Sequence, residues 1–317
     1  MLAAAAAAWA QAGDGPPPAW RPFNDTSPWN TPIARGAKAD AASARIMETL
    51  VRLAGGDSLG VNVRKWSVPV YWVDAAAAPR HDVTVIPPWV FNKVVDADGD
   101  GVAEAVPIPD GAAPDPMGDG HMCVADWRRG VAYDFLQAEQ PAPGEWQARA
   151  VDFWNLNGGG VHPPGVPSCR GSGFPLLAGL ILPHELEQGE IRHALALGTP
   201  NNLPDRFLPP ASATDGHAVA RPVLPEGARL QLDPALDLDA LGLSPAGKVI
   251  ARALQVYGAY VADNCGGFTL YAENTAAWND GLRVDEVGVI SARWFRVLKM
   301  GAPAYQAGDP TKREPGY

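Results

Sequence analysis

The sequence predicts a β-rich domain, an all-β sandwich of jelly-roll type with two packed helices. The chain holds 32 Pro and 34 Gly among 317 residues, which is about a fifth of the total and nearly twice the usual share. These turn formers are spread along the chain and separate short segments of alternating apolar and polar residues, the pattern of short strands. Two segments have a convincing helical period. A two-layer α+β fold is the alternative.

The two helices are expected over residues 40–54 and 244–257. Asp40 and Ser244 stand at their starts as N-caps, and Gly258 ends the second helix. In both segments, apolar residues recur every three or four positions, so each helix presents one apolar face. We therefore expect both helices to pack on a sheet.

A β-hairpin is expected at the centre of the chain, with strands over residues 122–126 and 131–136. Residues 127–130 form the turn, where Gly130 supplies the positive φ that a tight connection needs. Further strands are expected near residues 61–73, 83–85, 89–95, 146–156, 191–197, 225–232, 268–271 and 294–298.

The hairpin also predicts a candidate site. Asp119 and His121 precede its first strand, and Tyr133 and Asp134 lie on its second strand. Because the hairpin folds back on itself, an imidazole, a phenol and carboxylates come within reach of one another. A histidine that simply satisfies its hydrogen bonds within a strand is the alternative.

Domain organisation follows from the two ends of the chain. Residues 1–12, MLAAAAAAWAQA, are typical of the apolar part and the A-x-A end of a secretory signal peptide, although a flexible alanine-rich leader is the alternative. Residues 13–21 are a Pro/Gly linker, residues 22–300 a single β-rich domain, and residues 301–317 a loose tail. A secreted or periplasmic protein is expected.

Export would permit a disulfide among Cys123, Cys169 and Cys265. Three cysteines leave at least one thiol unpaired, so one disulfide or none is expected. The spacings carry no zinc signature.

Charge and aromatic content restrict the partners. A net charge of −10 argues against nucleic acid and against an anionic membrane surface, and no segment is long enough to span a bilayer. Eleven Trp residues suit stacking on sugars, for which Trp127 and Trp154 are the candidates. The expected partner is a polysaccharide or oligosaccharide.

An acidic loop predicts a structural Ca²⁺ site. Asp96, Asp98 and Asp100 alternate with small residues, as in the first half of an EF-hand loop. The twelfth position falls on Pro107, which has no carboxylate, so Glu104 or Asp110 would be the substitute, and Glu104 is taken as the fourth candidate ligand. An acidic β-turn without an ion is the alternative. No organic cofactor is expected.

Several longer stretches are distinctive in their order: SPWNTPI, DGHM, SGFPLLAGL, IRHALAL, LPEGARLQLDPALDLDALGL and YGAYVADNCGGFTLYAE. This succession, over about residues 22–280, resembles a family of secreted actinobacterial and acidobacterial proteins without an assigned activity. The resemblance implies an exported single domain. It also implies recurrent polar positions at His121, Asp134, His193 and Asp263, with Glu usual in the family at the position of Asp134.

These residues allow three kinds of chemistry. Asp134, paired with another carboxylate such as Asp263, would support glycoside hydrolysis. His121 and His193 with Asp263 could instead hold a divalent metal.

The third possibility is β-elimination at a uronate. His121 and Tyr133 would move the proton, while Arg170 or Asn264 would bind the substrate and neutralise its carboxylate. The function predicted from the sequence is therefore a secreted carbohydrate-active enzyme, a glycoside hydrolase or polysaccharide lyase. A non-catalytic carbohydrate-binding or cell-envelope structural module is the alternative.

Overall fold

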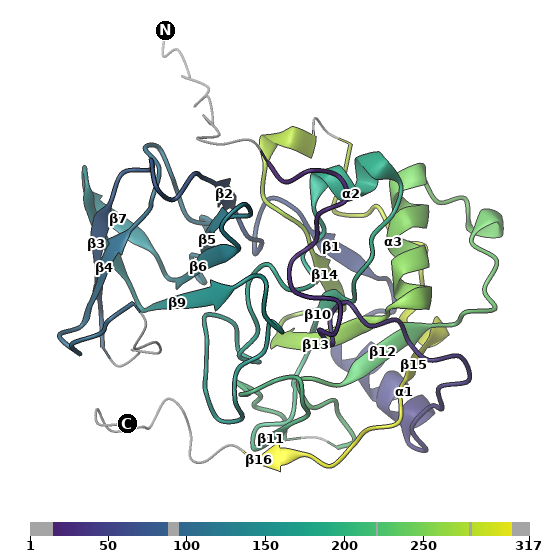
Figure 1. The fold of residues 1–317 in the computed structure, drawn as a ribbon. Coiled ribbons are helices and arrows are strands. Elements are labelled where there is room, and N and C mark those ends of the chain that lie inside the picture. Colours follow the sequence, from purple (N-terminus) through teal and green to yellow (C-terminus); the bar gives the residue numbers. More distant parts are fainter. Residues whose placement is uncertain (1–14, 88–94, 220, 279–280, 306–317) are drawn as a thin grey trace, which may run out of the picture.

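A computed structural model describes residues 15–87, 95–219, 221–278 and 281–305. It confirms a β-rich, sandwich-like fold, with 26% strand against 14% helix. Figure 1 shows two halves, one made of two small sheets and the other of a larger sheet covered by helices.

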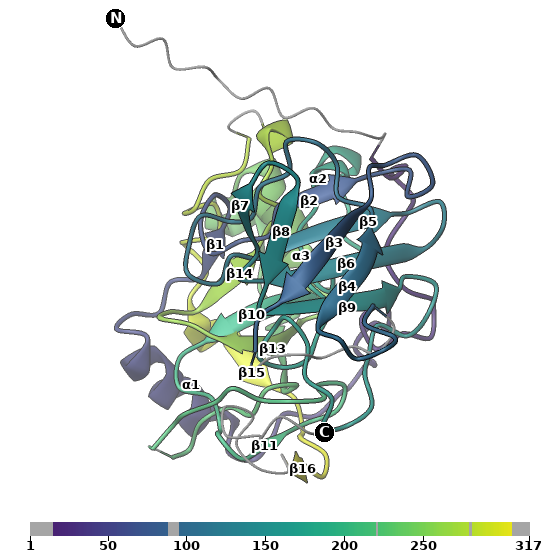
Figure 2. The ribbon, with the colours of Figure 1, turned by 90° about the vertical axis from the view of Figure 1, so that its left-hand side faces the viewer.

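One half is a sandwich of two four-stranded sheets. The first sheet has the order β2 (Val70–Trp72), β5 (Met122–Asp126), β6 (Val131–Leu136) and β9 (Ala150–Asn155), and the second β4 (Val102–Val106), β3 (His81–Val85), β8 (Glu145–Ala148) and β7 (Glu139–Ala142). One apolar cluster joins the facing sides of both sheets, including Val83, Val106, Met122 and Phe135. Figure 2 views this half, with β3, β4 and β8 in front of β5, β6 and β9.

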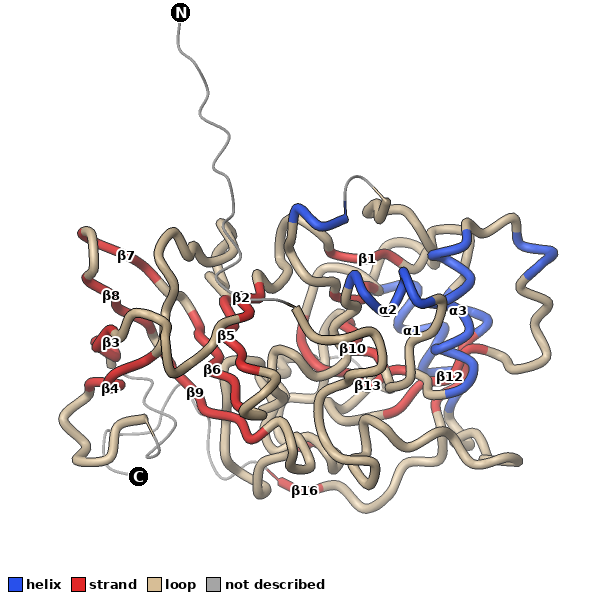
Figure 3. Tube along the Cα trace, turned by 45° about the horizontal axis from the view of Figure 1, so that its top comes forward, coloured by secondary structure: helices blue, strands red, loops and turns tan. Residues whose placement is uncertain are grey.

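The other half is a six-stranded mixed sheet. Its order is β1 (Gly60–Asn62), β14 (Thr269–Tyr271), β10 (Leu195–Thr199), β13 (Ala259–Asn264), β12 (Arg229–Leu232) and β15 (Phe295–Val297). Helices α1 (Ser43–Leu53) and α3 (Pro245–Val256) bury their apolar faces against it. Figure 3 shows the helices gathered at this end of the molecule.

A second apolar layer fastens the two halves together. Cys123 and Ala125 of β5 point into it from one side, while Ala196 of β10 and Ala262 of β13 point into it from the other. Trp29, from the segment that precedes α1, is 1% exposed in this layer. Since β5 has a buried residue at every position, it contributes side chains both to this layer and to the interior between the two small sheets.

The remaining elements are short. They are α2 (Pro183–Gln188), β11 (Arg206–Phe207), β16 (Ala304–Tyr305) and the 3-10 helices η1 (Asp239–Leu241), η2 (Ala276–Trp278) and η3 (Ala292–Trp294). Because β16 pairs with β11, the first residues of the expected loose tail are held in place.

Strand directions differ from those of a jelly roll, which is built from antiparallel pairs. The pairs β1/β14, β10/β13, β2/β5 and β3/β8 are parallel. Parallel pairs need long connections, and the loops of those connections carry the side chains described below.

The predicted hairpin is confirmed, since β5 and β6 have the expected bounds. Gly130 has a φ of 69°, and a Cβ atom there would lie 2.0 Å from Asn157 Nδ2. Glycine is therefore required at this turn on both counts.

Both predicted helices are confirmed, but the cap of the first is wrong. The N-cap of α1 is Ala42, and Asp40 instead accepts a hydrogen bond from the Ala42 N–H at 2.9 Å. Ser244 caps α3 as expected, with Oγ accepting from the Gly247 N–H at 3.0 Å.

Some expectations fall outside the described residues. These are the signal peptide over residues 1–12 and most of the strand expected near 89–95. In the described part of the chain, no helix combines the length and the apolar character needed to cross a bilayer.

Ser244→Ala should lower the free energy of unfolding by about 1 kcal/mol, because the first turn of α3 loses its side-chain acceptor. Ser244→Asn, which can still cap, is the control. Urea denaturation of the three proteins measures the difference, and an unchanged midpoint in Ser244→Ala would show that the cap contributes nothing.

Candidate functional site

The candidate site lies at the carboxyl ends of two neighbouring parallel strands, β10 and β13. Asp263 and Asn264 end β13, beside Gly198 and Thr199 of β10. The register shifts between Leu197 and Gly198, a local irregularity of the kind that re-aims side chains near binding sites.

Three carboxyl groups converge there. One oxygen from each of Asp215, Glu226 and Asp263 lies within 4.8 Å of the others. Asp215 is exposed, Asp263 half-buried and Glu226 fully buried. The group is thus open to solvent on one side and sealed on the other.

Two asparagines hold these acids in position. The Asn264 side chain donates from Nδ2 to Asp215 Oδ1 at 2.5 Å, and its Oδ1 accepts from the Asn202 N–H at 2.8 Å. Asn202 Nδ2 donates to Glu226 Oε1 at 3.3 Å and to the Asp263 carbonyl at 2.9 Å. Glu226 Oε2 finds no amide or hydroxyl donor among the described residues. The ionisation of Glu226 is therefore sensitive to the charges of Asp215 and Asp263.

Crowding and burial shift these acids toward their protonated forms. Burial, and then the charge of Asp215, raises the pKa of Asp263 well above its ordinary value, although the nearby Arg170 opposes the shift. The same two causes raise the pKa of Glu226. We therefore expect the group to hold at least one proton at neutral pH.

The hairpin half contributes Asp119. This side chain is half-buried, and burial together with the charges of Asp215 and Asp115 raises its pKa. A fourth carboxyl group, from the opposite half of the fold, thus lies in the field of the other three.

Arg170 is the cation beneath these acids. It is 2% exposed, and it donates to the carbonyls of Pro175, Leu176 and Ala178 at 3.2–3.4 Å. Its guanidinium carbon lies 5.1 Å from the centre of the Tyr271 ring. Carbonyl groups accept from both terminal nitrogens, whereas Nε has no hydrogen-bond partner among the described residues. The charge of Arg170 acts on Asp263.

Two glycines permit the close approach of these segments. A Cβ atom on Gly171 would lie 2.4 Å from Asp215 Cγ, and one on Gly198 would lie 2.6 Å from Tyr271 Oη. Larger residues at either position would displace the side chains of the site.

His121 lies next to the site rather than in it. The side chain is 7% exposed, and Nε2 lies 2.9 Å from the Cys169 carbonyl. Burial, helped by the charge of Arg170, lowers the pKa of His121 to about 4. A neutral imidazole that donates to a carbonyl suits a structural role.

Asp134 and Tyr133, two predicted catalytic residues, lie outside the group of three acids. Asp134 is 0% exposed, and its Oδ2 accepts from the Leu176 N–H at 2.7 Å. Tyr133 points to the other face of β6, as alternation requires, and packs edge-on against Phe153 at 5.4 Å. A polymer therefore cannot reach Asp134. Tyr133 faces the interior between the two small sheets and not the three acids.

His193 is buried apart from the three acids. It is 1% exposed, with Nε2 2.8 Å from Glu185 Oε1 and Nδ1 2.9 Å from the Ala194 carbonyl. Burial alone would lower the pKa of His193, but Glu185 outweighs burial and raises it. The pair forms an internal ion pair apart from the acids, so the two histidines do not share a metal with Asp263.

The predicted tryptophans serve the interior. Trp154 is 4% exposed and its ring centre lies 3.9 Å from that of His162. Trp127 is half-buried against the layer between the halves, with Arg128 4.5 Å from its ring centre. Trp154 cannot stack on a sugar from this position.

Of the predicted site residues, the structure brings together Asp263, Asn264 and Arg170, with His121 beside them. Sequence reasoning missed Asp215, Glu226 and Asn202 as members of the site. One signal could have found Asp215: the tripeptide Asp-Gly-His occurs at 119–121 and again at 215–217, and both aspartates lie at the site.

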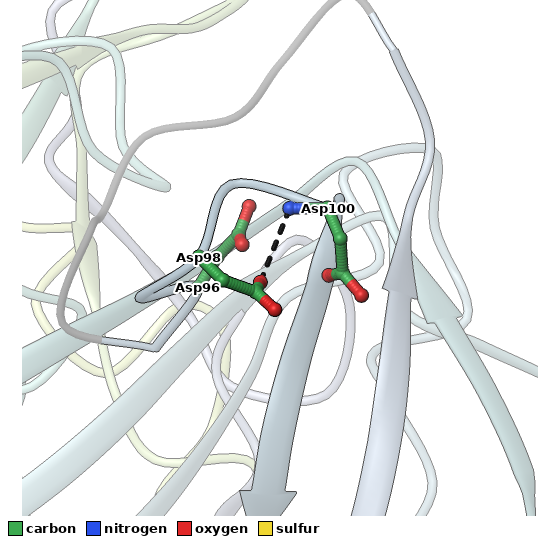
Figure 4. Close-up of side chains that lie close together, drawn as sticks. All are labelled: Asp96, Asp98 and Asp100. Carbon is green, nitrogen blue, oxygen red and sulfur yellow. Dashed lines mark hydrogen bonds between the residues drawn. The ribbon is translucent and has the colours of Figure 1, made fainter.

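The acidic loop brings three of its four predicted ligands together. One oxygen from each of Asp96, Asp98 and Asp100 lies within 4.8 Å of the others, and Figure 4 shows these side chains around the turn. Asp96 accepts from the N–H groups of Gly99 at 2.8 Å and Gly101 at 3.2 Å. Glu104 lies outside this group, on β4.

The three cysteines are free thiols. Cys123 and Cys169 are buried, while Cys265 is half-buried beside Asp263. Burial raises the pKa of Cys265 to about 12, so its thiol stays protonated at neutral pH and is a poor nucleophile.

Comparison with protein-family models, curated proteins and solved structures finds no match. The chemistry of the site is therefore argued from its own residues. A protonated acid beside an ionisable exposed one is suited to general acid and nucleophilic catalysis.

Asp134→Asn should flatten the pH dependence of stability. Burial raises the pKa of Asp134 from 3.8 to about 7, so between these values the folded protein holds a proton that the unfolded chain releases. Stability then falls as pH rises through this window, by up to about 1.4 kcal/mol per pH unit for this group. Urea denaturation at pH 5, 6 and 7 measures the slope.

In Asp134→Asn this contribution is absent, while those of other buried groups remain. Equal slopes in the two proteins would show that Asp134 is ionised at neutral pH despite its burial.

Proposed function

We propose that this protein is a secreted carbohydrate-active enzyme that hydrolyses glycosidic bonds in an extracellular polysaccharide. The observation that carries the proposal is the convergence of Asp215 and Asp263, one exposed and one half-buried, with Glu226 beneath them.

The spacing supports a retaining hydrolase. Retaining enzymes hold two carboxyl groups about 5–5.5 Å apart, whereas inverting enzymes leave about 6.5–9.5 Å for a water molecule. One oxygen of Asp215 and one of Asp263 lie within 4.8 Å of each other, which favours the shorter spacing of the retaining arrangement.

The roles follow from the environments. Asp263, whose pKa is raised by burial and by Asp215, donates its proton to the glycosidic oxygen as the bond to the anomeric carbon breaks. Asp215, exposed and oriented by Asn264, attacks that carbon and forms a glycosyl ester. Water then attacks the same carbon, gives its proton to Asp263, and releases Asp215 as a carboxylate.

Charge favours hydrolysis over β-elimination. A lyase must neutralise the carboxylate of a uronate. The candidate site instead gathers the carboxyl groups of Asp119, Asp215 and Asp263, which would repel a uronate. Arg170, the cation among them, already donates to backbone carbonyls. These acids favour a neutral glycan.

A non-catalytic binding module is the weaker alternative. Such a module needs an aromatic platform without titratable groups gathered beside it. Four carboxyl groups with three raised pKa values fit an acid–base site better. Export rests on the leader over residues 1–12 and remains part of the proposal.

A structural Ca²⁺ at Asp96, Asp98 and Asp100 accompanies this proposal. Three carboxylate ligands on one turn suit a hard cation, and backbone carbonyls and water would complete its shell. The ion would fasten the turn between residue 95 and β4, away from the catalytic carboxyls.

Asp263→Asn should lower glycan hydrolysis at least about a hundredfold, because the general acid is lost. Reducing ends and the ultraviolet absorbance of unsaturated uronates are followed over a panel of neutral and acidic polysaccharides. The melting temperature should not fall, since burial raises the pKa of Asp263 and the fold therefore favours a neutral side chain at this position.

Asp285→Asn, at an exposed ion pair with Arg283, is the matched control and should keep full activity. Full activity in Asp263→Asn would contradict the proposal, as would a panel on which the native protein cleaves nothing. Unsaturated products would assign the protein to the lyases instead.

Ca²⁺ added after chelation should raise the melting temperature by several degrees, because an ion that binds only the folded state stabilises it. Asp98→Asn should remove this shift without lowering hydrolysis. Scanning calorimetry with and without chelator makes the measurement, and identical melting curves would eliminate the ion.

A further inference from the structure

Trp66 combines exposure with an unfavourable backbone conformation. Its residue surface is 44% exposed, and its φ is +54°. A bulky residue in this left-handed region costs about 1–3 kcal/mol and persists where surrounding contacts impose it. Neither burial nor a turn preference explains tryptophan here, because glycine or asparagine would suit the conformation better.

One buried carboxylate imposes this conformation. Asp115 is 3% exposed and accepts from the N–H groups of Trp66 at 3.2 Å and Ser67 at 3.3 Å. Asn62 Nδ2 also donates to the Trp66 carbonyl at 3.0 Å. The indole is therefore displayed from a fixed turn.

The same carboxylate ties Trp66 to the catalytic carboxyls. Asp115 Oδ1 also accepts from the Met117 N–H at 3.0 Å, which orders the segment that leads to Asp119. A Cβ atom on Gly118 would lie 3.6 Å from Trp66 Cη2, so the indole lies against the residue that precedes Asp119. The charges of both Asp115 and Asp215 act on Asp119.

We propose that Trp66 is the stacking platform of a glycan-binding subsite beside the catalytic carboxyls, where it holds a neutral pyranose of the substrate chain. This inference rests on the proposed function. An exposed indole offers an apolar face to the C–H groups of a sugar ring, and the neighbouring acids would repel a uronate. The strain is retained because it presents that ring in one orientation.

The test measures binding and stability separately. Affinity electrophoresis in gels that contain β-glucan, xylan, mannan or arabinan uses the Asp263→Asn protein, which should bind without cleaving. Trp66→Gly should weaken the retardation by about tenfold in affinity and should raise the melting temperature, since glycine relieves the strained φ. Trp294→Ala, which removes another partly exposed indole, should leave the retardation unchanged.

Trp66→Tyr and Trp66→Leu form a second pair of variants. Both keep a bulky side chain at the positive φ, but only tyrosine is aromatic. Tyrosine should keep most of the binding and leucine should lose it. Equal binding by this pair, undiminished binding by Trp66→Gly, or no retardation of the parent protein by any neutral polysaccharide would overturn the inference. Binding through Trp66 to alginate or pectate alone would overturn the neutral substrate class.

Binding that depends on Trp66 without any cleavage by the native protein would reject the proposed hydrolase and keep the platform. Cleavage by the native protein at a rate that Trp66→Gly does not change would support the hydrolase and reject the platform.

Discussion

Repulsion among carboxyl groups is the constraint on which the candidate site depends. Asp215, Glu226 and Asp263 cannot all be ionised within 4.8 Å of one another when one is fully buried. The structure relieves the repulsion in two ways: Arg170 places a positive charge nearby, and the raised pKa values of Glu226 and Asp263 favour the protonated forms of these two acids. The proposed general acid depends on this preference for the protonated form.

Strand pairing and side-chain amides hold the backbone that produces this crowding. Asp263 ends a strand at the centre of the six-stranded sheet, and Asn202 and Asn264 connect it to the loop of Asp215. Gly171 allows that loop to approach, because any side chain there would meet the Asp215 carboxylate. Carboxyl groups held by a sheet and by paired amides keep their geometry without help from a ligand.

Local patterns in the sequence predicted the local structure well. The bounds of β5 and β6, the Gly130 turn and the Ser244 cap depend on neighbouring residues, and all are confirmed. The site depends on contacts between distant segments, which periodicity does not encode. Strand alternation could have separated Tyr133 from Asp134, but nothing local indicated that His193 pairs with Glu185 or that Glu226 lies beneath Asp263.

Titration of the Asp263 carboxyl is the most direct test of this account. The carboxyl ¹³C shift of labelled protein is followed by NMR as pH changes, and Asp263→Asn assigns the signal. A pKa well above the ordinary 3.8, which falls when Asp215 is replaced by Asn, is the expected result. A pKa of Asp263 near 3.8 that does not change in Asp215→Asn would show that the two acids do not interact. This result would contradict the proposed role of Asp263 as general acid.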